Sequence, residues 1–283
     1  MLHTGRGEAP LFSYVKLQNP IGPERSVVRR DLIPGLLQTL AKNVRHTPTV
    51  QAFELGFVAR PDDPRSEGGL PFETEQLAFV LTGDRQATSL YRKTAEQVDF
   101  FDAKATVEAM LAALHIEGAR YEAADHAPFQ PGVCARVFVG ERQLGFVGAV
   151  HPEVIAAFDI DAKRVFVGDF DVDALLDAAK PDFLCADLAR FPSVDLDISL
   201  LVDAGLPVAS VFQVIARGGG TLLEKAAIFD VYEGPGVPEG QKALAFRIWV
   251  NAGDRTLTME EAMDVRKSIT AEMVQSLKAT IRE

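Results

Sequence analysis

The sequence predicts an α+β protein made of two domains. Its 283 residues exceed the usual size of a single domain. Strand-like and helix-like stretches alternate irregularly over residues 1–178, which does not match a doubly wound parallel sheet. Residues 179–189 have the composition of a linker, and residues 190–283 show a second, more regular alternation. We therefore expect a mixed-sheet domain followed by a smaller α+β domain.

In the first domain, short apolar runs predict strands and periodic apolar positions predict helices. The clearest helix is expected over residues 99–116, where Val107, Met110, Leu111 and Leu114 form one apolar stripe. The other expected helices cover 34–46, 152–158 and 172–179. Strands are expected at 11–17, 51–60, 76–83, 133–140, 143–151 and 163–170.

The second domain reads as strand, helix, strand, strand, helix. Its first strand alternates, with Leu196, Ile198, Leu200 and Val202 on one face. The first helix begins near Pro207 and ends at Gly218–Gly220. The last helix opens with Thr258 and Glu261, the spacing of a capping box. This βαββα order is most of a ferredoxin-like sandwich, and no closing strand is expected before the chain ends at Glu283.

One face of this second sheet carries residues suited to single-stranded RNA. Aromatic rings stack on bases, and a carboxylate can accept hydrogen bonds from the Watson–Crick edge of guanine. The same pattern also fits an ordinary amphipathic sheet, or one covered by a partner. If Phe229 and Val231 face the helices, the exposed face gathers Asp230, Tyr232, Arg247 and Trp249.

Charge and cysteine content restrict the function classes. A net charge of −11 argues against binding long nucleic acid by charge alone. Cys134 and Cys185 are far apart, which indicates reduced thiols in a cytoplasmic protein rather than a disulfide framework. No apolar run approaches a membrane span, and the first ten residues lack the apolar core of a signal peptide.

Longer strings of the sequence resemble a known family. RFPSV, DISLLVD, LLEKAAIFDVYEGPGVPEGQKALAFRIWV and DRTLTMEEA closely resemble the ferredoxin-fold anticodon-binding domain of the bacterial phenylalanyl-tRNA synthetase β subunit. Upstream, NPIGPERSVVRRDLIPGLLQTLAKNVR, AFELGFV, VDFFDAKATVEAML and GFVGAVHPEV resemble its catalytic-like domain. The match runs in the right order from about Leu11 to Ala279.

The resemblance implies an α2β2 phenylalanine–tRNA ligase whose α subunit binds ATP, Mg²⁺ and phenylalanine. This chain would then contain no catalytic residue and no metal site, and would bind no cofactor alone. Residues 1–178 would form a degenerate class II synthetase-like domain that packs on α. Residues 190–283 would bind the anticodon of the phenylalanine tRNA. The implied contacts are Asp230, Tyr232, Ser199 and Ala243, with Arg247 beside them on the exposed face.

Some residues depart from the family pattern. Asp195 and Leu196 stand where basic residues are usual, and Ala243 replaces a serine. The amino-terminal editing and tRNA-binding modules of the family are absent, so the Met1 start suggests a fragment.

The nucleotide-binding elements of a class II synthetase are incomplete in this sequence. Arg60 and Asp62 match the R-x-(D/E) element that holds the α-phosphate of ATP in class II synthetases, although a solvated charge pair at a loop entrance is the simpler and favoured explanation. The glycine-rich strand with Gly145 and Gly148 runs into His151–Pro152, where an arginine is required. We therefore expect a related fold without the chemistry.

The remaining candidates favour structural roles. His126 and His151 match no metal-ligand or nucleophile motif, so a capping or packing role is expected for each. Glu122, Asp125 and His126 form only a weak candidate metal cluster. We expect the apolar stretch Leu32–Leu40 and the 99–116 helix to present surface to α.

Two other functions stay open. One is a freestanding RNA-binding or regulatory module without an α partner. The other is a small-molecule enzyme that uses Arg60 and Asp62.

Overall fold

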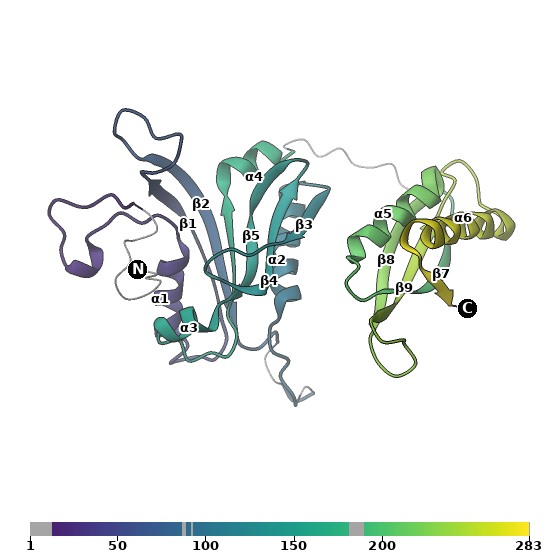
Figure 1. The fold of residues 1–283 in the computed structure, drawn as a ribbon, viewed down its shortest axis with the longest axis horizontal. Helices are drawn as coiled ribbons and strands as arrows, with labels where there is room; N and C mark the ends of the chain where they lie inside the picture. Colours follow the sequence, from purple (N-terminus) through teal and green to yellow (C-terminus); the bar gives the residue numbers. More distant parts are fainter. Residues whose placement is uncertain (1–12, 87–88, 92, 181–189, 283) are drawn as a thin grey trace. The chain divides into compact units, whose positions relative to one another are not determined.

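The computed structural model describes residues 13–86, 89–91, 93–180 and 190–282. The chain divides into two compact units, Met1–Leu184 and Cys185–Glu283. Each unit is described by itself (Figure 1). The division falls inside the expected linker, most of which lies outside the described residues, as does Cys185. Within the described residues, no helix combines the length and apolar character that a membrane crossing requires.

The first unit is built on a six-stranded antiparallel sheet in the order β1-β2-β6-β5-β4-β3. Its mixed α and β content and irregular strand order agree with the expected fold class. The short edge strand β3 was not expected from the sequence. The strands are β1 (Val50–Arg60), β2 (Phe72–Thr82), β3 (Ala119–Ala123), β4 (Phe129–Val139), β5 (Arg142–Val150) and β6 (Phe166–Asp171).

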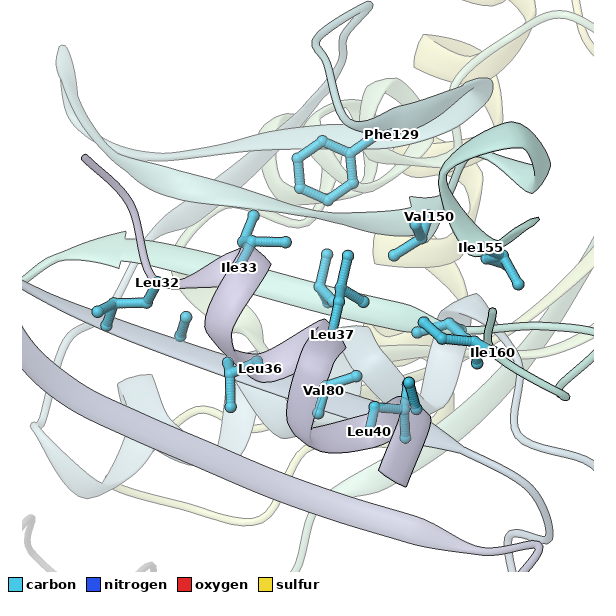
Figure 2. Close-up of a cluster of buried hydrophobic side chains, with 14 of the residues drawn as sticks. Leu32, Ile33, Leu36, Leu37, Leu40, Val80, Phe129, Val150, Ile155 and Ile160 are labelled. Atoms are coloured by element: carbon cyan, nitrogen blue, oxygen red, sulfur yellow. The ribbon is translucent and has the colours of Figure 1, made fainter. Parts of the chain in front are cut away.

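Helix α1 (Ile33–Asn43) buries its apolar side on one face of this sheet. Figure 2 shows Ile33, Leu37 and Leu40 of this helix packed with side chains from the sheet and from residues that follow strand β5. Leu37 and Leu40 are fully buried in this core, so truncating either to alanine should cost about 2–5 kcal/mol. The expectation that Leu32–Leu40 presents surface to a partner is therefore wrong, because its leucines are needed inside the domain.

Helices α2 (Phe100–Ala113) and α4 (Val172–Ala178) pack on the opposite face of the sheet. The stripe expected on α2 is confirmed, with Val107 and Leu111 buried and Met110 and Leu114 packed at its border. A reciprocal capping box between Asp99 and Asp102 begins α2. The short helix α3 (Pro152–Ala157) follows β5.

The strand expected at residues 11–17 is wrong. In the described part of this segment, pairing is limited to a single bridge between Lys16 and Val27. Pro20 and Pro23 lie between these two residues, and proline cannot donate to a strand ladder.

The second unit is a four-stranded antiparallel sheet in the order β10-β7-β9-β8. Helices α5 (Val208–Gly219) and α6 (Met259–Leu277) bury their apolar sides on one face of it, and the expected Thr258–Glu261 capping box begins α6. The strands are β7 (Val194–Asp203), β8 (Leu223–Tyr232), β9 (Gln241–Val250) and β10 (Thr280–Arg282).

The prediction that the closing strand is missing is wrong. Lys278 adopts a left-handed conformation with φ of 54° and ends α6, which turns the chain back toward the sheet. Buried Ala279 anchors the turn, and Thr280–Arg282 then pairs with β7. The unit is therefore a complete βαββαβ ferredoxin-like fold.

Candidate nucleic-acid interface

The sheet face opposite α5 and α6 gathers the residues predicted to bind RNA. In the strand register, Ser199 and Asp230 both pair with Ala245, which places the three in one row across the sheet. Tyr232 pairs with Ala243 in the neighbouring row. Because adjacent strands are about 4.8 Å apart, each row fits within the span of a nucleotide or two. Arg282 of β10 extends the first row, since it pairs with Ser199.

Strand β8 carries a bulge that changes which side chains reach this face. Ile228 pairs with Phe246 and Asp230 pairs with Ala245, so Phe229 is the extra residue between them. Phe229 is 57% exposed, and the Arg247 guanidinium carbon lies 5.5 Å from the centre of its ring. The prediction that Phe229 faces the helices is therefore wrong, because the bulge breaks the two-residue alternation on which it depended.

Asp230 and Tyr232 are both accessible on the open face. The Tyr232 hydroxyl donates a hydrogen bond to the Pro235 carbonyl at 3.2 Å. A Cβ atom added at Gly234 would lie 2.7 Å from that hydroxyl, so the loop after β8 packs closely against the phenol. This contact holds the ring in place while leaving 43% of the residue exposed.

Two predicted contacts offer less to a ligand than their positions suggest. Ala243 is only 8% exposed and presents little surface. Arg247 forms a bidentate ion pair with Asp197, with Nε–Oδ1 and Nη2–Oδ2 distances of 2.7 and 2.8 Å. The hydrogen bonds from Arg247 lower the pKa of the Asp197 carboxyl. The charge of Arg247 is therefore compensated within the protein.

A second aromatic side chain, Trp249, also lies on this face. It pairs with Asp195 on β7 and Lys225 on β8, and the Lys225 ammonium lies 5.2 Å from the Trp249 ring. This cation–π contact occupies one side of the ring.

In the first unit, the nucleotide-binding candidates are engaged elsewhere. Asp62 binds Arg30, and this hydrogen bond lowers the pKa of the Asp62 carboxyl. Burial raises the pKa values of the Asp31 and Asp169 carboxyls, and the positive charge of Arg60 partly offsets this rise. The pair Arg60–Asp62 thus does not form the simple charge pair that the sequence suggests.

The structural roles expected for the two histidines are confirmed. His126 stacks on Phe146 with ring centres 4.1 Å apart. His151 begins α3, where its Nδ1 accepts a hydrogen bond from the Glu153 backbone at 3.2 Å. Glu122 pairs with Arg120. Across the described residues, no three His, Cys, Asp or Glu side chains are grouped so that they could hold a metal ion.

Comparison with known proteins assigns the two units. A family model described as phenylalanyl tRNA synthetase beta chain CLM domain matches residues 3–172, which is more than half of the chain. The chain belongs to this family. A second model, described as ferredoxin-fold anticodon binding domain, matches residues 189–282. This second match coincides with the unit that carries the open sheet.

Curated relatives extend the similarity across both units. Phenylalanine–tRNA ligase β subunits from Syntrophotalea carbinolica, Moorella thermoacetica and Chromobacterium violaceum are each 36% identical over 270 to 272 residues. In each case the match covers 95% of this chain and 33% of the relative. The chain therefore spans about a third of the length of these synthetase subunits.

Phe229 is the residue on the candidate interface that sequence reasoning missed. Strict alternation along IFDVY assigns its side chain to the helix face, and no glycine or proline marks the bulge. The hydrophobic run Ile228–Phe229 is the available sign, because it places two large apolar side chains at consecutive positions beside an acidic residue.

Proposed function

We propose that this chain is the portion of a phenylalanine–tRNA ligase β subunit that supports the α catalytic subunit and binds the tRNA anticodon. The observation that carries the proposal is the open sheet of residues 190–282, where Phe229, Asp230 and Tyr232 are exposed within four residues. The match of this unit to an anticodon-binding domain supports the assignment. The matched relatives bear the β-subunit name, which favours it over a freestanding RNA-binding module.

The chemistry of the site suits a guanine at the first anticodon position. The Asp230 carboxylate offers two acceptor oxygens to the N1–H and amino group of that base, and the rings of Phe229 and Tyr232 offer stacking surfaces. Ser199 lies in the row of Asp230 and supplies a hydroxyl that both donates and accepts. Base stacking is worth about 1–3 kcal/mol, so a few contacts suffice without a basic surface.

In an α2β2 enzyme of this kind, ATP, Mg²⁺ and phenylalanine would bind to the α subunit. His151 stands after the glycine-rich strand β5 and caps α3. The His151 imidazole cannot replace the arginine guanidinium that would bind a nucleotide phosphate through two hydrogen bonds. The chain alone should therefore show no phenylalanine-dependent ATP–pyrophosphate exchange above a blank.

Strand β1 supplies a candidate docking surface for the α subunit. Phe53, Leu55 and Phe57 alternate along this edge strand and are 75%, 55% and 64% exposed. Contiguous exposed apolar side chains of this size are typical of protein interfaces. We therefore expect the α subunit to contact this surface of β1 and not the Leu32–Leu40 stretch.

The test is binding of phenylalanine tRNA carrying G or A at the first anticodon base. Tyr232→Ala should weaken binding about tenfold or more through lost stacking. Asp230→Asn replaces one acceptor with a donor, so it should reduce the preference for G over A while leaving other contacts intact. Thr221→Ala, an exposed change outside this sheet face, is the control. Unchanged discrimination in Asp230→Asn, with an intact circular dichroism spectrum, would place base reading elsewhere.

A further inference from the structure

The open face of the second sheet continues beyond the row that contains Asp230. Along β9, every second side chain points to this face, so Ala245, Arg247 and Trp249 follow one another toward the end of the strand. Trp249 lies four residues from Ala245, which is about 14 Å along the strand. The face therefore carries an aromatic side chain well away from the residues proposed to contact the first anticodon base.

Trp249 lies between side chains of opposite charge. Lys225 pairs with it on β8 and Asp195 pairs with it on β7, and both of these side chains are exposed. The Lys225 ammonium lies 5.2 Å from the centre of the Trp249 ring. Glu224, next to Lys225 in the chain, accepts a hydrogen bond from the Ser193 hydroxyl. Trp249 itself is half-buried, so the sheet holds the indole in place while part of it stays accessible.

The two cations of this part of the face differ in how their charge is offset. Arg247 binds the Asp197 carboxylate through two hydrogen bonds. Lys225 forms no ion pair with a carboxylate within the part of the chain that the structure describes, and its ammonium rests on the Trp249 ring. A cation–π contact at an exposed site is weak, so a phosphate can draw the ammonium away from the ring at little cost.

We propose that Trp249 and Lys225 form a second nucleotide subsite, in which a base stacks on the indole and its phosphate binds the Lys225 ammonium. The inference rests on the proposed binding of a tRNA anticodon by the same face. An indole offers a flat apolar surface to any base, and a lysine ammonium is a point charge that suits a phosphate. Asp195 repels a phosphate on the other side of the ring, so the RNA backbone passes on the β8 side.

The separation along β9 indicates which nucleotide this subsite receives. Bases that remain stacked are about 3.4 Å apart, so about 14 Å corresponds to about four nucleotides, and to fewer where bases are splayed out. The exposed ring of Phe229, beside Arg247, is available to a base between the two positions. The unpaired loop of a tRNA extends farther on the 3′ side of the first anticodon base than on its 5′ side. The base on Trp249 is therefore the third anticodon base or a loop nucleotide that follows it.

Trp249 is the single tryptophan of the chain, so tryptophan fluorescence reports on this subsite alone. The full chain is titrated with the anticodon stem-loop of phenylalanine tRNA, and the anisotropy of a dye on the RNA measures total binding in the same samples. We expect the tryptophan emission to fall in parallel with the rise in anisotropy, because a stacked base quenches indole. Stem-loops that lack one base each then locate the contact. Removing the base about two to four nucleotides 3′ of the first anticodon base should restore the emission while the RNA still binds.

Substitutions separate stacking from packing. Trp249→Leu should weaken binding about tenfold, whereas Trp249→Phe, which keeps an aromatic ring, should lose much less. Lys225→Gln should reduce the slope of log affinity against log salt by about 0.7, the value for one phosphate of a single strand. Lys267→Gln removes the same charge from α6, on the other side of the sheet, and should leave the slope unchanged. Thermal unfolding of each variant checks that it is folded.

The inference is overturned if the stem-loop binds and the Trp249 emission does not change. It is also overturned if Trp249→Leu and Lys225→Gln both bind like the unaltered chain. Quenching that is lost only when the first anticodon base is removed would place that base on Trp249 and would overturn it as well. No rise in anisotropy would reject anticodon binding itself and this subsite with it, whereas binding without quenching rejects the subsite alone.

Discussion

Arg247 and Asp197 face each other across β7 and β9 and share two hydrogen bonds, at 2.7 and 2.8 Å. About half of each side chain remains exposed. The Asp197 carboxylate offsets the positive charge of Arg247, so under the proposed function this part of the sheet would meet RNA with little uncompensated positive charge. Affinity there should depend on stacking and on base edges more than on phosphates.

Replacing the aspartate of this ion pair should leave the Arg247 guanidinium available to a ligand. Asp197→Asn removes one negative charge and leaves Arg247 free to contact a phosphate. We expect tighter tRNA binding at low salt, with the slope of log affinity against log salt steeper by up to about one. Fluorescence anisotropy over a range of salt concentrations measures both quantities. An unchanged slope would mean that the backbone of the RNA does not approach Arg247.

Phe229→Ala distinguishes the bulged strand from a regular one. If Phe229 were in the core, its loss would cost about 3–5 kcal/mol of stability. On the open face the cost should stay below about 1 kcal/mol, while tRNA binding weakens by about tenfold through lost stacking. Denaturant unfolding and tRNA titration of the same protein decide between these outcomes.

Leu55→Asp should prevent assembly with a cognate α subunit. It places a charge in the middle of the exposed row on β1, where an interface would have to bury it unpaired. Co-expression followed by size-exclusion chromatography should show separate subunits for this variant and a complex for the unaltered chain. Leu176→Asp, at an equally exposed position on α4, is the matched control. Normal assembly of Leu55→Asp would exclude the β1 surface.

The buried Asp169 should make the first unit less stable as the pH rises. Its pKa is raised to about 7 when folded, from 3.8 in its ordinary state, so the folded chain binds this proton more tightly. The resulting stabilisation is complete below about pH 4 and is lost as the pH rises toward 7. The free energy of unfolding of Asp169→Asn, measured relative to that of the unaltered chain, should therefore rise by about 1.4 kcal/mol for each pH unit in this window. Urea unfolding from pH 5 to pH 8 tests this, with Asp177→Asn as the control. A constant difference between Asp169→Asn and the unaltered chain would show that Asp169 does not titrate there.

The long periodic elements could be predicted because their patterns are local. The stripe on α2 and the capping box of α6 follow from spacings of three and four residues, and both appear in the structure. The strand β10 could not be predicted, because three residues carry no periodicity and their pairing depends on the left-handed turn at Lys278. The burial of Leu32–Leu40 inside the domain could not be predicted either, because an apolar run does not show whether the residues that cover it belong to the same chain.

Much of the candidate interface could be placed from the sequence as well. Strand alternation correctly puts Arg247 and Trp249 on one face of β9. It cannot show that Asp197 binds Arg247, because the partner lies fifty residues away along the chain. Strict alternation also misses the bulge, of which the run Ile228–Phe229 is the available sign, because a bulge depends on how β8 pairs with β9. The roles of Asp230, Tyr232 and Ser199 remain predictions.

The bulge at Phe229 changes the spacing of side chains along one face of β8. Along a regular strand, side chains on one face repeat about every 6.7 Å, so each tends to meet a different nucleotide. The extra residue places a ring and a carboxylate at consecutive positions on the same face. A base presents a flat surface for stacking and an edge for hydrogen bonds, at right angles to one another. Under the proposed function, one inserted residue would let a single strand contact both the face and the edge of one base.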